Sequence, residues 1–472
     1  MSRVLDIWRS WDAWQRAAAV TVALVAIAAA AYGAYLVVRR PADISHPQAK
    51  FVPKREKHKK AAPEMVNWPE YGLDDERTRY LPSTVVHPPF SRNWDFLSPS
   101  LLEFSPVYAH QRLYLINKDA TLYDLNAEQR GKVVWKRDLG SLSASSPAYH
   151  GRRVFAVTLT PGQVIAMRAG DGKVLWRHQL PGRSESSPLV HGNRVFVGSE
   201  SGDVFAFDER TGKVDWDFHS GGAVKGGVAY DHGAVFFGNY AGQVYAVDSS
   251  TGKVHWQAQT QGGGFLRGGG IYSTPAVAFG RVYFGGLDGR VYSYLERNGD
   301  LAWSHSTGAE VYPAPAVANP PGTPPSVFVG SQDHHFYALN ARTGAQRWEH
   351  NLGGNILGAA SVVGRDVYVS VIGPNVGTYG FRTDDGHKQF YSDIGEYNPV
   401  VSDGRRMFLT GANQVIQFTP RPAHTPKKLR QKRAKRKHAA HGKHAQHGAH
   451  AKHAKHPPAK HHRGGGGKRQ KG

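Results

Sequence analysis

The chain has 472 residues and a formal net charge of +22, but this charge is unevenly distributed. Residues 421–472 contain 17 Lys and Arg and no acid, residues 1–60 have a net charge of +7, and residues 61–420 have a net charge of −2. The long middle of the chain is therefore not basic, which argues against a nucleic-acid-binding domain, and no specific nucleic-acid recognition is predicted. The absence of Cys excludes disulfides, thiol nucleophiles and lipid-modified cysteines.

The first predicted element is an apolar helix at residues 17–38, preceded by an N-terminal flank at 1–16. These 22 residues contain no charge, and about 20 apolar residues are enough to span a membrane as a helix. Aromatic residues suited to membrane interfaces stand around it at Trp8, Trp11, Trp14, Tyr32 and Tyr35. We interpret the segment as an uncleaved single-pass transmembrane helix. A cleaved signal peptide is the alternative, although the apolar stretch is longer than the ~15 residues usual in such peptides.

Residues 39–89 are predicted to be a linker, because the stretch that follows the helix is rich in Pro, Lys and Ala. Basic residues are more numerous after the apolar helix than before it. The positive-inside rule would therefore place the large C-terminal part in the cytoplasm.

Residues 421–472 form a Lys/His/Ala/Gly tail that is predicted to be disordered. Its histidines recur with a period of three, at His438, His441, His444, His447, His450, His453 and His456. Neutral imidazoles bind Zn, Ni or Cu, so a weak metal site is one hypothesis. The other is contact with anionic polymers, lipid headgroups or nucleic acid through the tail's charge.

The middle of the chain is a repeat, recognised by a Gly followed four residues later by an aromatic residue. The pairs are Gly131–Trp135, Gly172–Trp176, Gly212–Trp216, Gly252–Trp256, Gly299–Trp303, Gly344–Trp348 and Gly386–Phe390. Successive aromatic residues are 40–47 positions apart, and each unit contains four strand-like runs separated by turn signals. A repeated four-stranded unit of this length is typical of β-propeller blades.

The aligned starts of the innermost strands predict eight blades in an all-β propeller over residues 90–420, with seven as the alternative. The last repeat ends near Phe418 without an outer strand, whereas residues 90–97 precede the first repeat and carry Trp94. We predict that residues 90–97 supply the missing strand, because this closure removes the open edge of the ring.

Six tryptophans are interpreted as structural residues that dock one blade against the next. They are Trp135, Trp176, Trp216, Trp256, Trp303 and Trp348. The Gly before each of them is expected in a turn that requires positive φ.

The repeat resembles a known family through the pattern Ala-x-Asp-x-x-Thr-Gly-Lys-x-x-Trp. It stands here at Ala206, Asp208, Thr211, Gly212, Lys213 and Trp216, and again at Ala246, Asp248, Thr251, Gly252, Lys253 and Trp256. This pattern is similar to the tryptophan-docking motif of the pyrroloquinoline quinone (PQQ) repeat propellers. One branch of that family comprises dehydrogenases that use PQQ and Ca²⁺. The other comprises compact non-catalytic scaffolds, including the lipoprotein that assists assembly of outer-membrane β-barrels.

The resemblance to the compact branch implies a membrane-anchored binding or assembly scaffold at the cell envelope, with another envelope protein as partner and no cofactor. The blades are short except around 261–270 and 319–325, and no Asp/Asn/Glu cluster suggests a Ca²⁺ site. A PQQ- and Ca²⁺-dependent dehydrogenase is the alternative, and a polyanion tether acting through the basic tail is the second alternative. The family also favours a propeller outside the cytoplasm, against the charges that flank the helix.

The candidate site is the mouth of the central channel, where the residues just before each innermost strand should gather. The third position before each strand start gives Glu103, Ala144, Glu185, Lys225, Tyr272, Tyr312, Leu357 and Glu396, with Arg183 and Arg267 near them in sequence. The charged and Tyr members of this ring could bind a small polar ligand or a loop of a partner. The alternative is a hydrated mouth without a ligand. No catalytic residue is predicted, because no nucleophile–His–Asp order, phosphate loop or dinucleotide motif is present.

Overall fold

A computed structural model describes residues 11–38, 42–53, 65–82, 84–262, 269–397 and 400–421. Arg267 and the basic tail from residue 422 onward, with its seven periodic histidines, lie outside the described residues.

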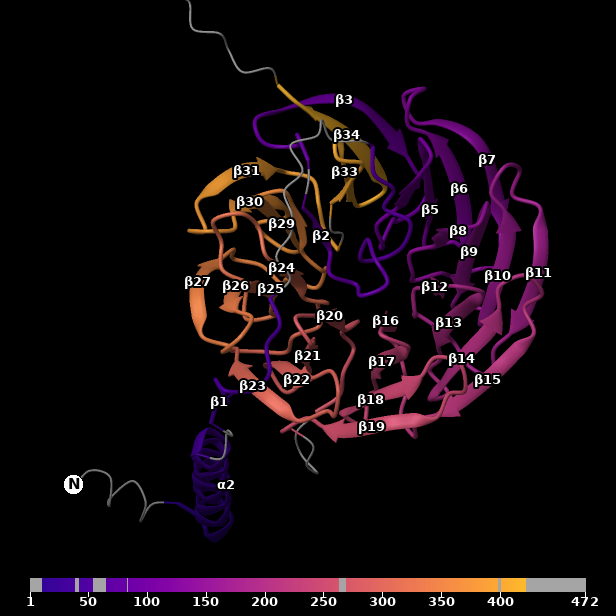
Figure 1. The fold of residues 1–472 in the computed structure, drawn as a ribbon. Helices are drawn as coiled ribbons and strands as arrows, with labels where there is room; N and C mark the ends of the chain where they lie inside the picture. Colours follow the sequence, from indigo (N-terminus) through magenta and orange to yellow (C-terminus); the bar gives the residue numbers. More distant parts are fainter. Residues whose placement is uncertain are drawn as a thin grey trace, which may run out of the picture. The chain divides into compact units, whose positions relative to one another are not determined.

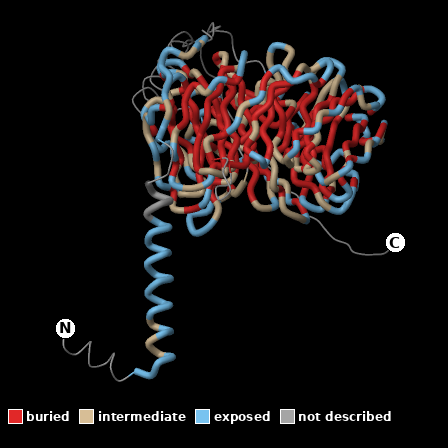
Figure 2. The backbone as a smooth tube through the Cα atoms, turned by 90° about the horizontal axis from the view of Figure 1, so that it is seen from below, coloured by how far each residue is buried: buried red, intermediate tan, exposed pale blue. Residues whose placement is uncertain are grey.

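The predicted apolar helix is α2 (Ala13–Val38), which begins four residues earlier than the sequence suggested. Asp12 and Gln15 form a capping pair at its start, in which the Gln15 Oε1 accepts a hydrogen bond from the Asp12 N–H at 3.0 Å. Residues Ala13–Gly33 are long and apolar enough to cross a membrane, and none of that stretch is buried (Figure 2). A membrane anchor and a signal sequence both have this length and composition.

The first four blades are four-stranded antiparallel sheets arranged in chain order around a central axis (Figure 1). Blade 1 is β4 (Val107–Ala109), β5 (Arg112–Ile116), β6 (Thr121–Asn126) and β7 (Lys132–Asp138). Blade 2 is β8 (Ala148–His150), β9 (Arg153–Thr158), β10 (Gln163–Arg168) and β11 (Val174–Gln179). Blade 3 is β12 (Leu189–His191), β13 (Arg194–Gly198), β14 (Asp203–Asp208) and β15 (Val214–His219). Blade 4 is β16 (Ala229–Asp231), β17 (Ala234–Gly238), β18 (Gln243–Asp248) and β19 (Val254–Gln259).

Four more blades complete the ring, and two of them gain a short strand from the N-terminal segment. Blade 5 is β20 (Ala276–Ala278), β21 (Arg281–Gly286), β22 (Arg290–Leu295) and β23 (Leu301–Ser306), with β1 (Ile44–Ser45) added outside. Blade 6 is β24 (Ala316–Ala318), β25 (Ser326–Gly330), β26 (His335–Asn340) and β27 (Gln346–Asn351). Blade 7 is β28 (Ser361–Val363), β29 (Asp366–Val371), β30 (Gly377–Arg382) and β31 (Lys388–Ser392), with β2 (Tyr80–Leu81) added inside, parallel to β28. Blade 8 is β32 (Val401–Ser402), β33 (Met407–Gly411), β34 (Gln414–Pro420) and β3 (Phe90–Leu97).

The predictions of eight blades and of ring closure by residues 90–97 are both confirmed. Strand β3 pairs antiparallel with β34 from Phe90 opposite Pro420 to Leu97 opposite Gln414. The last blade thus combines three C-terminal strands with one N-terminal strand, so no blade edge is left open between the first and last repeats.

The tryptophans at the ends of the blades all make the same contact. Each indole N–H donates to a backbone carbonyl in the turn before the outer strand of the next blade, at 2.7–3.4 Å. The pairs are Trp135 with Ala169, Trp176 with Glu209, Trp216 with Ser249, Trp256 with Glu296, Trp303 with Ala341, and Trp348 with Thr383. The hydrogen bond satisfies the one polar atom of each buried ring, so these six seams exclude water without an unpaired indole donor. At the seam between blades 8 and 1, by contrast, the buried indole N–H of Trp94 has no hydrogen-bond partner among the described residues.

The conserved spacing of the repeat motif follows from the geometry of this turn in blade 3. The Asp208 carboxylate accepts hydrogen bonds from the Thr211 N–H at 2.8 Å and from its hydroxyl at 2.6 Å. Gly212 follows with φ +70°, and a Cβ at that position would lie 2.5 Å from the Trp176 ring of blade 2. The motif therefore combines two features: a turn capped by the Asp carboxylate, and a glycine without a side chain, against which the Trp of the preceding blade packs.

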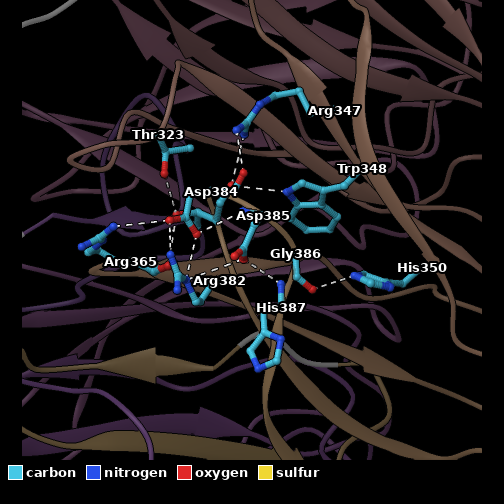
Figure 3. Close-up of polar contacts among 11 residues, drawn as sticks. Thr323, Arg347, Trp348, His350, Arg365, Arg382, Asp384, Asp385, Gly386 and His387 are labelled. Atoms are coloured by element: carbon cyan, nitrogen blue, oxygen red, sulfur yellow. Dashed lines mark hydrogen bonds and ion pairs between the residues drawn. The ribbon is translucent and has the colours of Figure 1, made fainter.

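Figure 3 shows this seam between blades 6 and 7. The Arg347 guanidinium donates to the carbonyls of Thr383 and Asp384 at 3.1 and 3.0 Å, beside the Trp348 indole. The His350 ring donates to the Gly386 carbonyl at 2.7 Å. The outer strand β27 is thus fixed to the β30–β31 turn through Arg347, Trp348 and His350, of which Trp348 and His350 alternate along one face and Arg347 lies at a register shift of the strand.

Part of the expected linker lies inside the ring. Residues 65–82, called the plug below, pass around the central axis and contact every blade (Figure 1). Backbone N–H groups of the innermost strands donate to plug carbonyls, at Tyr149 to Pro69, Tyr230 to Asp75, Val277 to Glu76, Val317 to Thr78 and Val362 to Arg79, all at 2.7–2.9 Å. Trp68 pairs with Tyr108 in blade 1, Glu70 accepts from the Val190 N–H in blade 3, and Val66 donates to Asp403 in blade 8. The plug thereby satisfies the free edges of the short innermost strands.

Candidate functional site

The plug is held by a fully buried arginine, Arg77. Its guanidinium donates to the carbonyls of Val228 and Pro188, both at 3.0 Å, and to the carbonyl of Tyr71 within the plug. The Glu70 carboxylate lies 3.5 Å from it. A planar group with five donors can satisfy carbonyls from several directions at once, which explains an Arg at this position.

Burial changes the protonation of the plug's acids. Burial raises the pKa of Glu70 to about 8, although the nearby Arg77 acts in the opposite direction. Burial likewise raises the pKa of Asp74 to about 7, against the hydrogen bonds that Thr78 donates to it. Near neutral pH the Glu70 carboxyl is therefore held largely protonated and the Asp74 carboxyl about half protonated, which reduces the charge enclosed in the channel.

On one side of the plug, the channel opens into a pocket of about 230 Å³. Tyr71 supplies the plug's part of the lining, and the walls come from the segments that lead into the innermost strands. The side chains that matter for chemistry are Glu103, Glu185, Lys225, Tyr272, Tyr312 and Tyr397, with Phe104 beside them. We call this the channel pocket.

The predicted ring of residues is largely brought together here. Six of its eight members line the channel pocket, namely Glu103, Glu185, Lys225, Tyr272, Tyr312 and Leu357. Ala144 and Glu396 are not in the lining, and Tyr397 takes the place expected for Glu396. Arg183 is exposed and also stands outside the lining, and Arg267 is not among the described residues.

One wall of the channel pocket is an ion-pair network around Lys225. Its ammonium lies 2.9 Å from the Glu185 carboxylate and 3.2 Å from that of Glu200. The Tyr272 hydroxyl donates to the other Glu185 oxygen at 2.7 Å. Although burial acts in the opposite direction, these hydrogen bonds from Tyr272 and Lys225 leave the pKa of Glu185 below its ordinary value. Glu185 is therefore ionised, and the charge of Lys225 is already shared by two carboxylates.

The opposite wall carries a carboxylate of a different kind, Glu103. Within the described ranges, no side chain or backbone group makes a hydrogen bond or ion pair with it. Burial and the negative charge of Glu185 raise its pKa, and Lys118 only partly offsets them. The channel pocket thus contains more negative than positive charge.

A second cavity of about 610 Å³ lies against the other part of the plug. Its lining includes Leu73, Asp74 and Thr78 of the plug and Val277 and Val317 of blades 5 and 6. Residues of the plug therefore contribute to the lining of both cavities.

One cluster among the described residues has the composition of a metal site, and it is not in the channel pocket. Asp231, His232 and Glu296 have their ligand atoms within 4.8 Å of one another, at the turns of blades 4 and 5. The His232 Nδ1 lies 2.9 Å from Asp231 and 3.0 Å from Glu296. The hydrogen bond with Glu296 and the charge of Asp231 raise the pKa of His232. These contacts are those of an ion pair that joins two blades.

The channel pocket does not fit PQQ. That cofactor carries three carboxylates and a rigid tricyclic ring, so it needs unengaged cations around a large flat site. Here its carboxylates would face Glu103 and Glu185, while Lys225 is engaged by Glu185 and Glu200. The volume of about 230 Å³ is also below the ~300–1,000 Å³ usual for pockets that hold drug-sized ligands.

The sequence itself matches a family described as outer membrane protein assembly factor BamB, over residues 118–224 and 200–422. The chain belongs to this family of PQQ-repeat propellers. No curated protein matches the chain significantly.

Solved structures with the same fold include a BamB protein and several dehydrogenases. BamB from Moraxella catarrhalis superposes with a TM-score of 0.59 at 17% identity, covering 70% of this chain and 100% of that chain. The quinohemoprotein alcohol dehydrogenase ADHIIG from Pseudomonas putida HK5 gives a TM-score of 0.63 at 14% identity, covering 76% of this chain and 82% of that chain. A europium-containing methanol dehydrogenase gives 0.63 at 14% identity, covering 75% and 98%. At these identities the likeness establishes the eight-bladed fold, which hosts more than one activity.

Tyr272 and Tyr312 were predicted from the sequence, whereas three other aromatic residues of the lining, Tyr71, Phe104 and Tyr397, were not. Phe104 and Tyr397 are direct neighbours of the ring residues Glu103 and Glu396, so a wider window around each strand start could have included them. Tyr71 had no such signal, because it lies in the segment treated as linker.

Proposed function

We propose that this protein is a membrane-anchored, non-catalytic PQQ-like propeller that acts as a binding or assembly scaffold in the cell envelope. One observation carries the proposal: the chain's own plug occupies the central channel, and the channel pocket beside it is small and negatively charged. Such a pocket suits contact with a partner better than retention of an anionic cofactor.

Three further features support a scaffold. The blades are compact, with innermost strands of two or three residues and tight turns between the others. The family that the chain belongs to is described by a role in outer membrane protein assembly, and BamB shares the fold. Helix α2 supplies a segment able to hold the protein at a membrane. We infer that the partner is another envelope protein and that the propeller lies outside the cytoplasm.

The competing function, a quinoprotein dehydrogenase, is tested by titrating the purified full chain with PQQ and Ca²⁺. We expect no saturable binding and no dye reduction with alcohols or sugars, because Lys225, the one Lys in the channel-pocket lining, is already engaged by Glu185 and Glu200. Saturable binding together with substrate-dependent dye reduction would overturn the proposal.

The scaffold function is tested by site-specific photo-crosslinking in cells. A photoreactive residue at Leu357, in the channel pocket, should crosslink to a component of outer-membrane β-barrel assembly. The matched control is Val133, an exposed residue on the outer strand of blade 1, where we expect no such product. Equal labelling of that component at both positions, or at neither, contradicts a specific docking face.

Membrane topology is tested by protease treatment of intact and permeabilised cells. If the propeller is extracytoplasmic, the protease should cleave it under conditions in which cytoplasmic marker proteins stay intact. Cleavage should occur either in intact cells or once the outer envelope alone has been permeabilised. Protection equal to that of a cytoplasmic marker would place the propeller inside. An intact α2 in the mature protein, measured by mass, distinguishes an anchor from a removed signal.

A further inference from the structure

Five aromatic side chains contribute to the lining of the channel pocket, four from segments that lead into blades 1, 5, 6 and 8 and one from the plug. They are Phe104, Tyr272, Tyr312 and Tyr397 from the blades and Tyr71 from the plug. The rings of Tyr272 and Tyr312 have centroids 5.6 Å apart, and those of Tyr71 and Phe104 are 6.0 Å apart in an edge-on arrangement. The face of an aromatic ring carries partial negative charge, so a group of rings around a small cavity favours a cation inside it.

Neighbouring cations show that rings in this region accept such contacts. The Arg79 guanidinium lies 4.6 Å from the centroid of Tyr71, and the Lys225 ammonium lies 5.5 Å from that of Tyr240. Arg79 belongs to the plug and lies outside the pocket lining, whereas Lys225 is part of the lining and contacts Tyr240 just outside it, so neither contact fills the channel pocket.

The charges in the channel pocket, like the aromatic rings, favour a bound cation. Lys225 is neutralised by Glu185 and Glu200, which lie 2.9 and 3.2 Å from its ammonium. Glu103 is left without an ion-pair partner among the described residues, half-buried beside Phe104. A buried carboxylate is costly unless it is paired, so a ligand cation that reaches Glu103 would recover that cost.

We propose that the channel pocket binds an organic cation, specifically the ammonium or guanidinium end of a Lys or Arg side chain. The inference rests on the proposed function, because the cation would be presented by a loop of the partner protein. The volume of about 230 Å³ suits one long side chain rather than a cofactor of the size of PQQ. Glu103 supplies the charge, and Tyr272 and Tyr312 supply the ring faces over which the cation lies.

An anionic ligand is the opposite possibility, and the structure disfavours it. The one Lys in the lining already has two carboxylate partners, so an incoming anion would have to displace Glu185 or Glu200. It would also approach Glu103 without a compensating cation. Removal of Lys225 should therefore weaken cation binding little, whereas removal of Glu103 should weaken it strongly.

The test is calorimetric titration of the purified full chain, in detergent, with short peptides that differ in one side chain. The probes are acetyl-Gly-Gly-Arg-Gly-Gly-amide, the same peptide with Lys, a version with citrulline as the neutral isostere of Arg, and a version with Glu. We expect binding of the Arg and Lys peptides, with the citrulline and Glu peptides at least about tenfold weaker. A free diamine is included to learn whether the cation alone suffices.

The residues are tested with Glu103→Gln and with Tyr312→Leu, each expected to weaken binding of the Arg peptide at least about tenfold. The matched control is Glu396→Gln, which changes the same residue type at the equivalent ring position but outside the lining, and should alter binding by less than about twofold. Thermal unfolding of each variant reports whether it is folded. Because Glu103 and Tyr312 come from different segments of the channel wall, one variant still tests the proposal if the other does not fold.

A pH series adds an independent signature. Burial and Glu185 raise the pKa of Glu103 above that of an ordinary Glu, so lowering the pH removes its charge earlier than usual. Affinity for the Arg peptide should therefore fall as the pH is lowered from 7 towards 5, and this dependence should be lost in Glu103→Gln.

The outcomes separate this inference from the proposed function. Absence of Arg and Lys binding, preference for the Glu peptide, or an unchanged affinity in Glu103→Gln would overturn the cation pocket while leaving the crosslinking result standing. Conversely, cation binding without a crosslink to a component of β-barrel assembly would support the cation pocket and contradict the proposed scaffold function.

Discussion

The outer rim and the central plug hold the propeller together in opposite ways. At the rim, seven blade seams use one arrangement, in which an indole lies on a glycine of the next blade. The tryptophans are Trp94, Trp135, Trp176, Trp216, Trp256, Trp303 and Trp348. The eighth seam uses Phe390 against Phe90, with ring centroids 5.4 Å apart. In the plug each blade meets a different residue, and the contact that recurs from blade to blade is a backbone hydrogen bond that requires no particular side chain.

The propeller therefore has two sources of stability: the repeated seams at the rim and the single plug segment at the centre. A repeated seam can lose one member and keep the other seams, since each blade contacts only its neighbours. The plug contacts all the blades at once, so damage to it is felt around the whole ring. It also shapes the channel pocket through Tyr71.

The largest expected effect is at the rim, in Trp303→Ala. Trp303 is 0% exposed and donates to the Ala341 carbonyl at 2.9 Å. Its removal leaves a cavity, while the Ala341 carbonyl keeps the hydrogen bond that the Tyr283 hydroxyl donates at 3.1 Å, and the free energy of unfolding should fall by about 3–5 kcal/mol. Urea denaturation followed by near-UV circular dichroism measures the change. Trp348→Ala is the matched variant, because Trp348 is only partly buried and its hydrogen bond is longer, 3.4 Å. A loss in Trp348→Ala as large as that in Trp303→Ala would contradict the assigned role of burial.

The next effect is in the plug, in Arg77→Ala. Carbonyls of three residues lose their donor, and Glu70 loses its nearest cation. We expect a loss of about 2–3 kcal/mol, below the ~3–5 kcal/mol for breaking a buried ion pair, because Glu70 can take up a proton. The measurement is again urea denaturation, with exposed Arg210→Ala as control within about 0.5 kcal/mol of the parent. Equal stabilities of both variants would mean that the plug does not hold the ring.

The same contrast explains what could be predicted from the sequence. The rim was predictable because Trp176 and Gly212 belong to a pattern that recurs at nearly constant spacing. The strand 90–97 was predictable because Trp94 stood outside the repeat while the last repeat lacked an outer strand. In both cases a local signal was strengthened by repetition.

The plug could not be predicted, because its sequence has the composition of a solvated linker. Glu70, Asp74, Arg77 and Arg79 are charged residues that are ordinarily exposed, and they are buried here only because eight innermost strands surround them. Those partners come from positions up to some 330 residues away, and no local pattern marks them.

The channel pocket lies between these two cases. Glu103, Glu185, Lys225, Tyr272 and Tyr312 were placed by aligning strand starts, which repeat like the rim. Tyr397 rather than Glu396 lines the pocket in blade 8. Neighbouring residues of an extended segment point to opposite sides, so a shift of one residue relative to the other blades exchanges the two side chains.

The smallest expected effect isolates the contact between indole and glycine from the backbone requirement of the turn. Gly344 and Gly192 have φ of +76° and +61°, so an Ala at either position meets left-handed backbone strain of about 1–2 kcal/mol. Only at Gly344 would the new Cβ meet a neighbour, 2.7 Å from the Trp303 ring, whereas nothing lies within 4 Å at Gly192. Gly344→Ala should therefore destabilise the propeller by about 1 kcal/mol more than Gly192→Ala in urea denaturation. Combining Gly344→Ala with Trp303→Ala should remove this excess, because the obstructing ring is gone. If the extra destabilisation caused by Gly344→Ala persists in the double variant, Gly344 is required only for the backbone conformation of the turn. The contact between indole and glycine would then contribute less to the stability of the rim than the structure indicates.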